Sequence, residues 1–238
     1  MLDPNGRVIM ISGANRGIGR AVAAVLRDKG YTLSLGARRP EALDGFLAAG
    51  DTETAMGHAF EAGDAASAAA WVAATVARFG RLDGVVANAG VLHEFTVEDE
   101  DETGLDEMWE VNVKGPLRLI RAAFPHLKRS GSGRIVNVVS LSGKRVRGAA
   151  IAGYAMSKHA ALALTHGARY SGWRHGIRAA AICPGYVRSD MTAAVEEVPG
   201  DDMVQPQSVG EIAAMLLAMP NTASITEVPV NCVLEHTF

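Results

Sequence analysis

A glycine-rich turn between a buried strand and a helix constrains the fold more than any other feature of this sequence. Val8 to Ile11 is a short apolar run typical of a buried strand, Ser12 to Gly19 follows, and Arg20 to Lys29 has helical composition. Tyr31 to Gly36 then indicates a second strand. The chain therefore opens with a βαβ unit, and two parallel strands joined by a helix require a parallel sheet.

The same alternation of strand and helix continues along the rest of the chain. Strands are predicted at Thr54 to Phe60, Leu82 to Ala87, Ile135 to Val139, Ile177 to Cys183 and Glu227 to Val233, and helices at Pro40 to Ala48, Ala65 to Phe79, Leu105 to Leu127, Ala152 to Trp173, Met191 to Glu197 and Ser208 to Ala218. Gly80, Gly131 and Gly176 each follow a helix and precede a strand, where a left-handed cap favours glycine. The pattern predicts an α/β fold: one Rossmann-type doubly wound domain with a mostly parallel seven-stranded sheet flanked by helices.

Composition narrows the class of protein. With 238 residues, of which 48% are hydrophobic, the chain can bury the core of one full sheet, and no linker divides residues 1–238. A net charge of −3 offers no basic surface for nucleic acid, and no apolar run is long enough to span a membrane. The N-terminal residues do not resemble a signal peptide, so we expect a cytoplasmic protein. Cys183 and Cys232 are expected to be reduced thiols, and no metal site is predicted.

The turn itself is suited to binding a phosphate. Its glycines, Gly13, Gly17 and Gly19, allow the backbone to approach a pyrophosphate, and the amides that begin the following helix are unpaired donors. A tight connection without a ligand is the alternative. After the second strand the chain continues with Arg38 and Arg39, with no carboxylate before Glu41. Together with Arg16, this favours the 2′-phosphate of NADP, with NAD as second choice, although Arg39 alone is equally typical of a solvated surface.

A second constellation lies near the middle of the chain. Ser140 follows a predicted strand, and Tyr154 and Lys158 share one face of the next predicted helix because they are four residues apart. A phenol has a pKa near ~10, and a neighbouring ammonium group stabilises the phenolate and lowers that pKa. The three groups could therefore exchange a proton with a substrate. The alternative for Tyr154 and Lys158 is a chance pair on a solvated helix.

Taken together, these motifs resemble those of the short-chain dehydrogenase/reductase family: the glycine segment, Asn112, Ser140 and the Tyr154-x-x-x-Lys158 pattern. The resemblance implies an NADP-dependent oxidoreductase that transfers a hydride between nicotinamide and a carbonyl or secondary alcohol. It implies that Tyr154 is the general acid/base, that Ser140 binds the substrate oxygen, and that Lys158 lowers the pKa of Tyr154 and holds the nicotinamide ribose. Asn112 would hold a water that links Lys158 to solvent. The alternative for Asn112 is an ordinary residue on a helix surface.

The resemblance also implies a set of cofactor-binding residues. These are Gly13, Asn15, Arg16, Gly17, Ile18, Gly19, Arg38, Asp64, Asn88, Ala89, Gly90, Tyr154, Lys158, Pro184, Gly185, Val187 and Ser189. Ser12 and Ser189 stand where the family more often has threonine. The alternatives are that Asp64 caps a helix, that Asn88 ties adjacent strands together, and that Pro184 and Gly185 form a simple turn. The nucleotide-binding part would span about 8–140 and the catalytic and substrate part about 140–238.

The substrate side is less defined. Ser142, His93 and Tyr186 are candidate substrate contacts, with Phe95 and Met191 as further pocket residues, because all follow predicted strand ends. For Ser142 the alternative is shaping the turn, and for His93 it is a solvated loop. By analogy with the family, a homodimer or homotetramer is expected. Two other functions stay open: a non-catalytic NADP-binding redox sensor, and an epimerase or lyase on the same fold.

Overall fold

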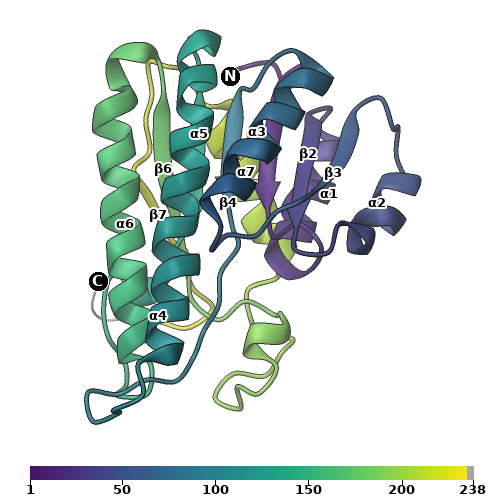
Figure 1. Ribbon diagram of the computed structural model, residues 1–238. Coiled ribbons are helices and arrows are strands. Elements are labelled where there is room, and N and C mark those ends of the chain that lie inside the picture. The colour runs from purple at the N-terminus through teal and green to yellow at the C-terminus, as the bar shows by residue number, and fades with distance from the viewer. Residues whose placement is uncertain (235–238) are drawn as a thin grey trace.

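The computed structural model describes residues 1–234, and within them seven strands form one parallel sheet (Figure 1). The strands are β1 (Val8–Ser12), β2 (Thr32–Ala37), β3 (Ala55–Ala59), β4 (Gly84–Ala87), β5 (Arg134–Val138), β6 (Arg178–Pro184) and β7 (Glu227–Val230). Their order is β3-β2-β1-β4-β5-β6-β7, and every neighbouring pair is parallel. The predicted fold class is confirmed. The direction of winding reverses between β1 and β4, which is where such sheets bind ligands at their carboxyl ends.

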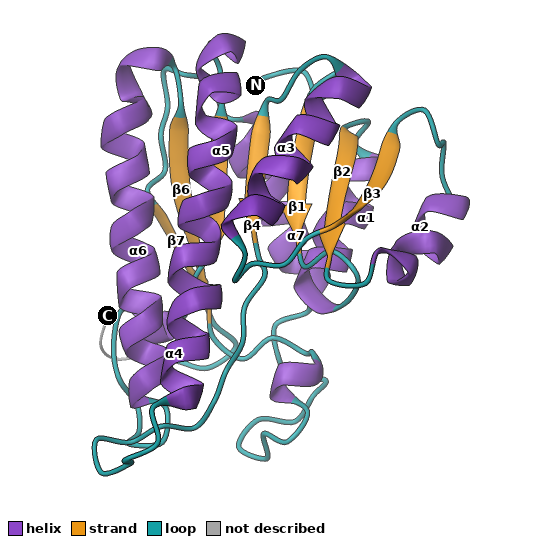
Figure 2. Ribbon diagram, viewed as in Figure 1, coloured by secondary structure: helices purple, strands orange, loops and turns teal. Residues whose placement is uncertain are grey.

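Helices cover both faces of the sheet (Figure 2). They are α1 (Gly17–Asp28), α2 (Asp44–Ala48), α3 (Ala65–Phe79), α4 (Thr103–Trp109), α5 (Gly115–Ser130), α6 (Ala152–Gly172) and α7 (Pro206–Ala218). On one face α1 packs against α7, and on the other α3 packs against α5, which contacts α6. The last four residues, which the sequence analysis places in the same domain, lie outside the described part of the chain.

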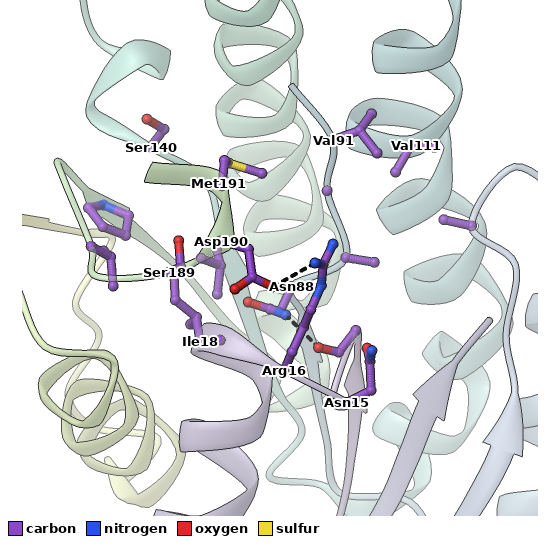
Figure 3. A pocket seen from close by; sticks show the side chains of 18 of the residues that line it. Asn15, Arg16, Ile18, Asn88, Val91, Val111, Ser140, Ser189, Asp190 and Met191 are labelled. Carbon is purple, nitrogen blue, oxygen red and sulfur yellow. Dashed lines mark hydrogen bonds and ion pairs between the residues drawn. The ribbon is translucent and has the colours of Figure 1, made fainter. Parts of the chain in front are cut away.

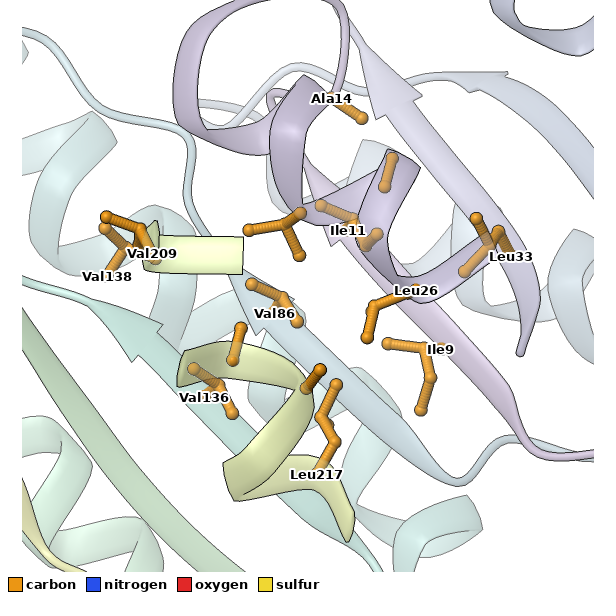
Figure 4. Packing of buried hydrophobic residues seen from close by; sticks show 14 of the residues in the cluster. Ile9, Ile11, Ala14, Leu26, Leu33, Val86, Val136, Val138, Val209 and Leu217 are labelled. Carbon is orange, nitrogen blue, oxygen red and sulfur yellow. The ribbon is translucent and has the colours of Figure 1, made fainter. Parts of the chain in front are cut away.

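Alternate residues of the central strands pack into two separate hydrophobic cores, one on each face of the sheet. Ile9 and Ile11 of β1 pack with Leu26 of α1 and Leu217 of α7 on one face (Figure 4). Met10, between them in sequence, packs with Trp71 of α3 on the other face. Because side chains alternate along a strand, a strand buried on both faces must be apolar at every position, as β1 is through residue 11.

The helix predicted over 40–48 begins as a 3-10 turn at Pro40–Leu43, the last strand ends at Val230 instead of Val233, and two further departures are larger. The predicted helix over 105–127 starts at Thr103, ends at Ser130, and is interrupted by a π-helical turn at Glu110–Lys114. The prediction of a helix over 191–197 is wrong, because only a 3-10 turn at Asp190–Thr192 forms there. The Thr192 hydroxyl donates to the Val187 carbonyl (2.5 Å), which ties this turn back to the preceding chain instead of extending a helix.

The glycine caps are confirmed. Gly80, Gly131 and Gly176 have φ values of 75°, 64° and 75°, in the left-handed region, where they end a helix before the next strand. These three turns bring the chain back to the amino-terminal edge of the sheet. The carboxyl edge is left to the longer loops that build the site.

Candidate active site

A cleft of about 430 Å³ lies over the carboxyl ends of the strands. It brings together most of the predicted site residues: Gly13, Asn15, Arg16, Gly17, Ile18, Arg38, Asn88, Ala89, Gly90, Ser140, Tyr154, Lys158, Pro184, Gly185, Val187 and Ser189. Figure 3 shows that the labelled residues come from segments far apart in sequence, with Arg16 and Asn88 close together and Ser140 apart from them. The two constellations found in the sequence therefore face one cleft.

The glycine-rich loop (residues 12–19) depends on its glycines for two different reasons. Gly13 and Gly17 have positive φ, 65° and 51°, a conformation that other residues adopt at a cost. Gly19 has an ordinary φ, but a Cβ on it would lie 2.2 Å from the carbonyl oxygen of Gly13. Gly19 does not line the cleft. Its function is to let α1 approach the loop, so that the first amides of α1, which no side chain caps, face the cleft as an anion site.

Ser12 and Asn88 fix this loop to the end of β4. The Ser12 hydroxyl accepts hydrogen bonds from the backbone amides of Asn88 (2.9 Å) and Ala89 (3.0 Å). In return, Asn88 Nδ2 donates to the carbonyls of Ser12 (3.0 Å) and Gly13 (3.3 Å). Asn88 thus ties two strand ends together and also lines the cleft. Serine supplies the one hydroxyl acceptor that this position requires.

Asp64 agrees with its helix-capping alternative and not with a place in the wall of the cleft. Its carboxylate accepts a hydrogen bond from the Ala66 amide (2.8 Å) and caps α3, and Asp64 does not line the cleft. The residues that do line it after β3 are Phe60, Glu61 and Ala62. The acidic residue at this wall is therefore Glu61. The β3 strand ends at Ala59, so the chain leaves the cleft before it reaches Asp64.

Three arginines supply positive charge at the open side of the cleft. Arg38 and Arg39 follow β2, are exposed, line the cleft, and have no ion-pair partner among residues 1–234. Arg39, which sequence alone left as a surface residue, thus belongs to the wall. Arg16 is also a wall residue, and its guanidinium pairs with Asp190 of the loop after β6 at 2.6 Å (Figure 3).

Ser140, Tyr154 and Lys158 meet at the other end of the cleft. Ser140 follows β5, its hydroxyl accepts from the Ser142 amide (3.0 Å), and it lies close enough to Tyr154 to influence the phenol pKa. Lys158 Nζ lies 5.6 Å from the centre of the Tyr154 ring and donates to the Val138 carbonyl at 3.3 Å. Ser142 does not line the cleft, so the structure agrees with its turn-shaping alternative.

Burial is the main cause of the pKa shifts of Tyr154 and Lys158 at this end of the cleft. Removal from water raises the pKa of Tyr154 to about 12, while the Ser140 hydroxyl acts in the opposite direction. The same effect lowers the pKa of Lys158 to about 8. The sequence analysis expects Lys158 to lower the phenol pKa below its usual value. The structure differs because the loss of hydration raises the phenol pKa by more than the Ser140 hydroxyl lowers it.

Asn112 lies in the π-helical turn and is buried, so the surface alternative is wrong. Its Oδ1 accepts from the Val91 amide (2.9 Å), and its Nδ2 donates to the Val91 carbonyl (2.9 Å) and to the Ser157 hydroxyl (3.0 Å). The Ser157 hydroxyl in turn donates to the Tyr154 carbonyl (2.8 Å). The Asn112 side chain therefore connects the segment after β4 to the helix that carries Tyr154 and Lys158.

Some of the predicted substrate and pocket residues line the cleft, and others lie outside its lining. His93 does not line the cleft but hydrogen-bonds through Nε2 to Glu107 (2.8 Å), which does. Tyr186 also lies outside the lining, and its hydroxyl donates to Glu197 at 2.7 Å. Phe95 is absent from the lining, whereas Met191 is part of it.

Sequence reasoning missed several lining residues: Ala37, Phe60, Glu61, Ala62, Val91, Glu107, Val111, Val138, Val139, Asp190 and Thr192. Most are direct neighbours of a predicted residue or follow a strand end, so a wider window at each strand end would have found them. Glu107 and Val111 are four residues apart and therefore lie on one helix face. If one of them is known to face the cleft, the other is expected to face it too.

Other side chains offer no competing site within the described chain. Cys183 and Cys232 are free thiols, and burial raises the pKa of Cys183 to about 11. Residues 1–234 contain no cluster of metal-ligating side chains. Over the same residues, no helix is both long and apolar enough to cross a bilayer.

The fold and this cleft define a family. Residues 7–199 match the model of the family described as short chain dehydrogenase, so the chain belongs to the short-chain dehydrogenase/reductase family. Its relatives are oxidoreductases. Agropine synthesis reductase of Rhizobium rhizogenes is 40% identical over 96% of this chain, and the match covers 53% of that protein. The chain thus spans about half the length of this relative.

Two solved structures share the whole fold. An alcohol dehydrogenase from the archaeon Thermococcus sibiricus, complexed with 5-hydroxy-NADP, superposes with a TM-score of 0.87 at 29% identity, covering 97% of this chain and 98% of that one. Levodione reductase has a TM-score of 0.86 at 28% identity, with 96% and 97% covered. Both cover nearly all of the sheet and its loops.

Proposed function

We propose that this protein is an NADP(H)-dependent oxidoreductase that transfers a hydride between nicotinamide and a carbonyl or secondary alcohol, with Tyr154 as general acid/base. One observation carries the proposal. Ser140, Tyr154 and Lys158 occupy one end of a cleft whose other end is a glycine-rich anion site. A proton donor and a place for a dinucleotide are thus parts of a single cavity.

The residues divide the reaction between them. Bound NADPH would supply the hydride, which is the difficult part of the chemistry. At neutral pH the phenol of Tyr154 keeps its proton, because its pKa lies at about 12, and it is ready to donate that proton to a carbonyl oxygen. The Ser140 hydroxyl donates a hydrogen bond to the same oxygen as charge develops there. Lys158 is mostly protonated at neutral pH and stabilises the phenolate that the transfer leaves.

The arginines favour NADP over NAD. Arg16, Arg38 and Arg39 line the cleft, and guanidinium groups bind phosphate in a bidentate manner. The 2′-hydroxyl of NAD prefers a carboxylate after β2, and the chain has none before Glu41. The T. sibiricus dehydrogenase, a structural relative over nearly the whole chain, was solved with an NADP derivative. NAD remains the second choice.

The substrate is a small carbonyl compound or alcohol. The catalytic end of the cleft combines apolar Val91, Val111, Val139 and Met191 with Glu107, which suits a molecule with an apolar body and some polar groups. Residues 1–238 act as one catalytic domain, and pairing into a homodimer or homotetramer is expected by analogy with the family.

The test is turnover of NADPH with a panel of aldehydes and ketones, compared between the wild type and Tyr154→Phe. We expect the variant to lose about 10²- to 10⁴-fold in kcat because the proton donor is gone. The matched control is Tyr170→Phe, on the same helix but 78% exposed, which should keep wild-type rates.

Three outcomes would contradict the proposal. NADPH binding with no turnover of any carbonyl would indicate a redox sensor. Product formation without net consumption of NADPH would indicate an epimerase or lyase. Equal rates in the wild type and Tyr154→Phe would remove Tyr154 from the mechanism.

A further inference from the structure

Two loops from opposite ends of the chain touch across the open side of the cleft. The β6–α7 loop (residues 185–205) contacts the glycine-rich loop at two adjacent points. A Cβ on Gly17 would lie 3.7 Å from Ser189 Cβ, and Arg16 Nη1 lies 2.6 Å from Asp190 Oδ2. The two charged residues are 174 positions apart in sequence, and both line the cleft (Figure 3).

Asp190 places a carboxylate at the guanidinium that the proposed function assigns to a cofactor phosphate. The Asp190 carboxylate occupies Arg16 Nη1 and offsets part of the guanidinium charge, so Arg16 offers fewer donors and a weaker attraction to a phosphate than an unpaired arginine does. Arg38 and Arg39, the other two cleft arginines, have no ion-pair partner among residues 1–234. Arg16 is therefore the cleft arginine for which a carboxylate and a cofactor phosphate compete.

We propose that Asp190 is a specificity-determining residue: its carboxylate competes with the 2′-phosphate of NADP(H) for Arg16 and so reduces the preference of the enzyme for NADP(H) over NAD(H). This inference rests on the proposed function, because it assumes that Arg16 binds that phosphate. NADPH must take Arg16 from Asp190. NADH carries no 2′-phosphate and leaves the pair in place, so Asp190 weakens the binding of NADPH alone.

The size of the effect follows from the exposure of the pair. The side chains of Arg16 and Asp190 are 66% and 72% exposed, so water and salt screen their attraction. Exposed ion pairs of this kind correspond to a roughly two- to fivefold change in an equilibrium constant. The contribution is modest, and it should decrease as ionic strength rises.

The experiment is measurement of the dissociation constants of NADPH and NADH by fluorescence titration or calorimetry on the full chain, at low and high salt. In Asp190→Asn we expect NADPH to bind about two- to fivefold more tightly at low salt, with NADH changed much less. The ratio of the two constants therefore increases.

The matched control is Asp201→Asn. Asp201 lies in the same β6–α7 loop and pairs with Arg188 at 2.7 Å, with side chains 89% and 59% exposed, and neither residue lines the cleft. This variant makes the same change in net charge without releasing Arg16. A general effect of charge on anionic cofactors would appear in both variants, whereas competition for Arg16 appears only in Asp190→Asn.

A double-mutant cycle tests directly whether the effect of Asp190 on NADPH binding depends on Arg16. In an Arg16→Ala background, Asp190→Asn should no longer change NADPH affinity, because the contested group is absent. Equal tightening of NADPH and NADH in Asp190→Asn would overturn the inference, as would an unchanged ratio or a persisting effect without Arg16. If the wild type binds no NADPH, the proposed function itself fails, and the two failures are thereby distinguished.

Discussion

The ionisable residues at the two ends of the cleft differ in their exposure to solvent. At the catalytic end Tyr154 and Lys158 are buried, and desolvation shifts both pKa values by a large amount. At the nucleotide end Arg16, Arg38 and Arg39 are at the surface, while the loop beneath them is fixed by Ser12 and Asn88. Under the proposed function this difference has a chemical reason: a proton must be held in a controlled state, whereas a phosphate must be reached from solution.

Burial also explains the number of cations that line each end of the cleft within residues 1–234: Lys158 alone at one end, and three arginines at the other. An electrostatic interaction is stronger where water is excluded, so one lysine is sufficient beside Tyr154. Each exposed arginine contributes less because solvent and salt screen it. Under the proposed function, several arginines are therefore needed to hold the phosphate of the cofactor.

The largest expected effect tests the buried end. Because burial lowers the pKa of Lys158 to about 8, its charged fraction falls as pH rises through that value. The Tyr154 phenol stays protonated over the same range, since its pKa is about 12. We expect kcat/KM for carbonyl reduction to fall about tenfold per pH unit above the Lys158 pKa, as the free enzyme loses its ammonium charge.

A pH profile of kcat/KM from neutral to alkaline pH measures this directly. Lys158→Arg keeps its charge throughout and should flatten the alkaline limb, even if its overall rate is lower. A wild-type profile that shows no decline until well above the pKa of an ordinary lysine would show that the buried end does not depend on this titration.

A second prediction concerns the hydrogen bonds beneath the exposed end. Ser12→Ala removes the acceptor for the amides of Asn88 and Ala89, which are left without their partner. We expect about 1–3 kcal/mol lower free energy of unfolding. Denaturant unfolding measures it, with Ser171→Ala on the exposed side of α6 as the control. Equal stability of the two variants would mean that the loop does not need this anchor.

The smallest expected effect tests the exposed arginines. Arg38→Ala should weaken NADPH binding by about three- to tenfold at low salt and leave NADH nearly unchanged, because only NADPH carries the 2′-phosphate. Fluorescence titration of both cofactors measures the ratio. Arg174→Ala, an exposed arginine outside the cleft, is the control. A similar loss for NADH would assign Arg38 to the pyrophosphate instead.

The sequence predicted which residues meet in the cleft better than it predicted their burial and pKa values. Ser140 could be placed at the carboxyl end of a strand, and Tyr154 and Lys158 on one helix face, from spacing alone. Spacing says which way a side chain points but not how much protein covers it. The raised pKa of Tyr154 was therefore out of reach, because it depends on burial by packed neighbours.

Other features failed for local reasons. The resemblance places Asp64 at the cofactor, whereas the structure agrees with its helix-capping alternative, and the residues that line the cleft follow directly after the end of β3 at Ala59. The pairing of Arg16 with Asp190 joins exposed residues far apart in sequence, and no periodic pattern marks such a contact. The helix expected over 191–197 was replaced by side-chain bonds of Thr192 to the backbone.

The π-helical turn at Glu110–Lys114 has a consequence for protein engineering. A π turn holds one more residue than the α turn it replaces. Deleting one residue from it would let α4 and α5 continue as one regular α-helix, with the residues on either side of the turn kept on their present faces. The change would be confined to the stretch that holds the Asn112 amide against Val91 and Ser157. A deletion at this place would therefore separate the contacts of Asn112 from the packing of the two helices.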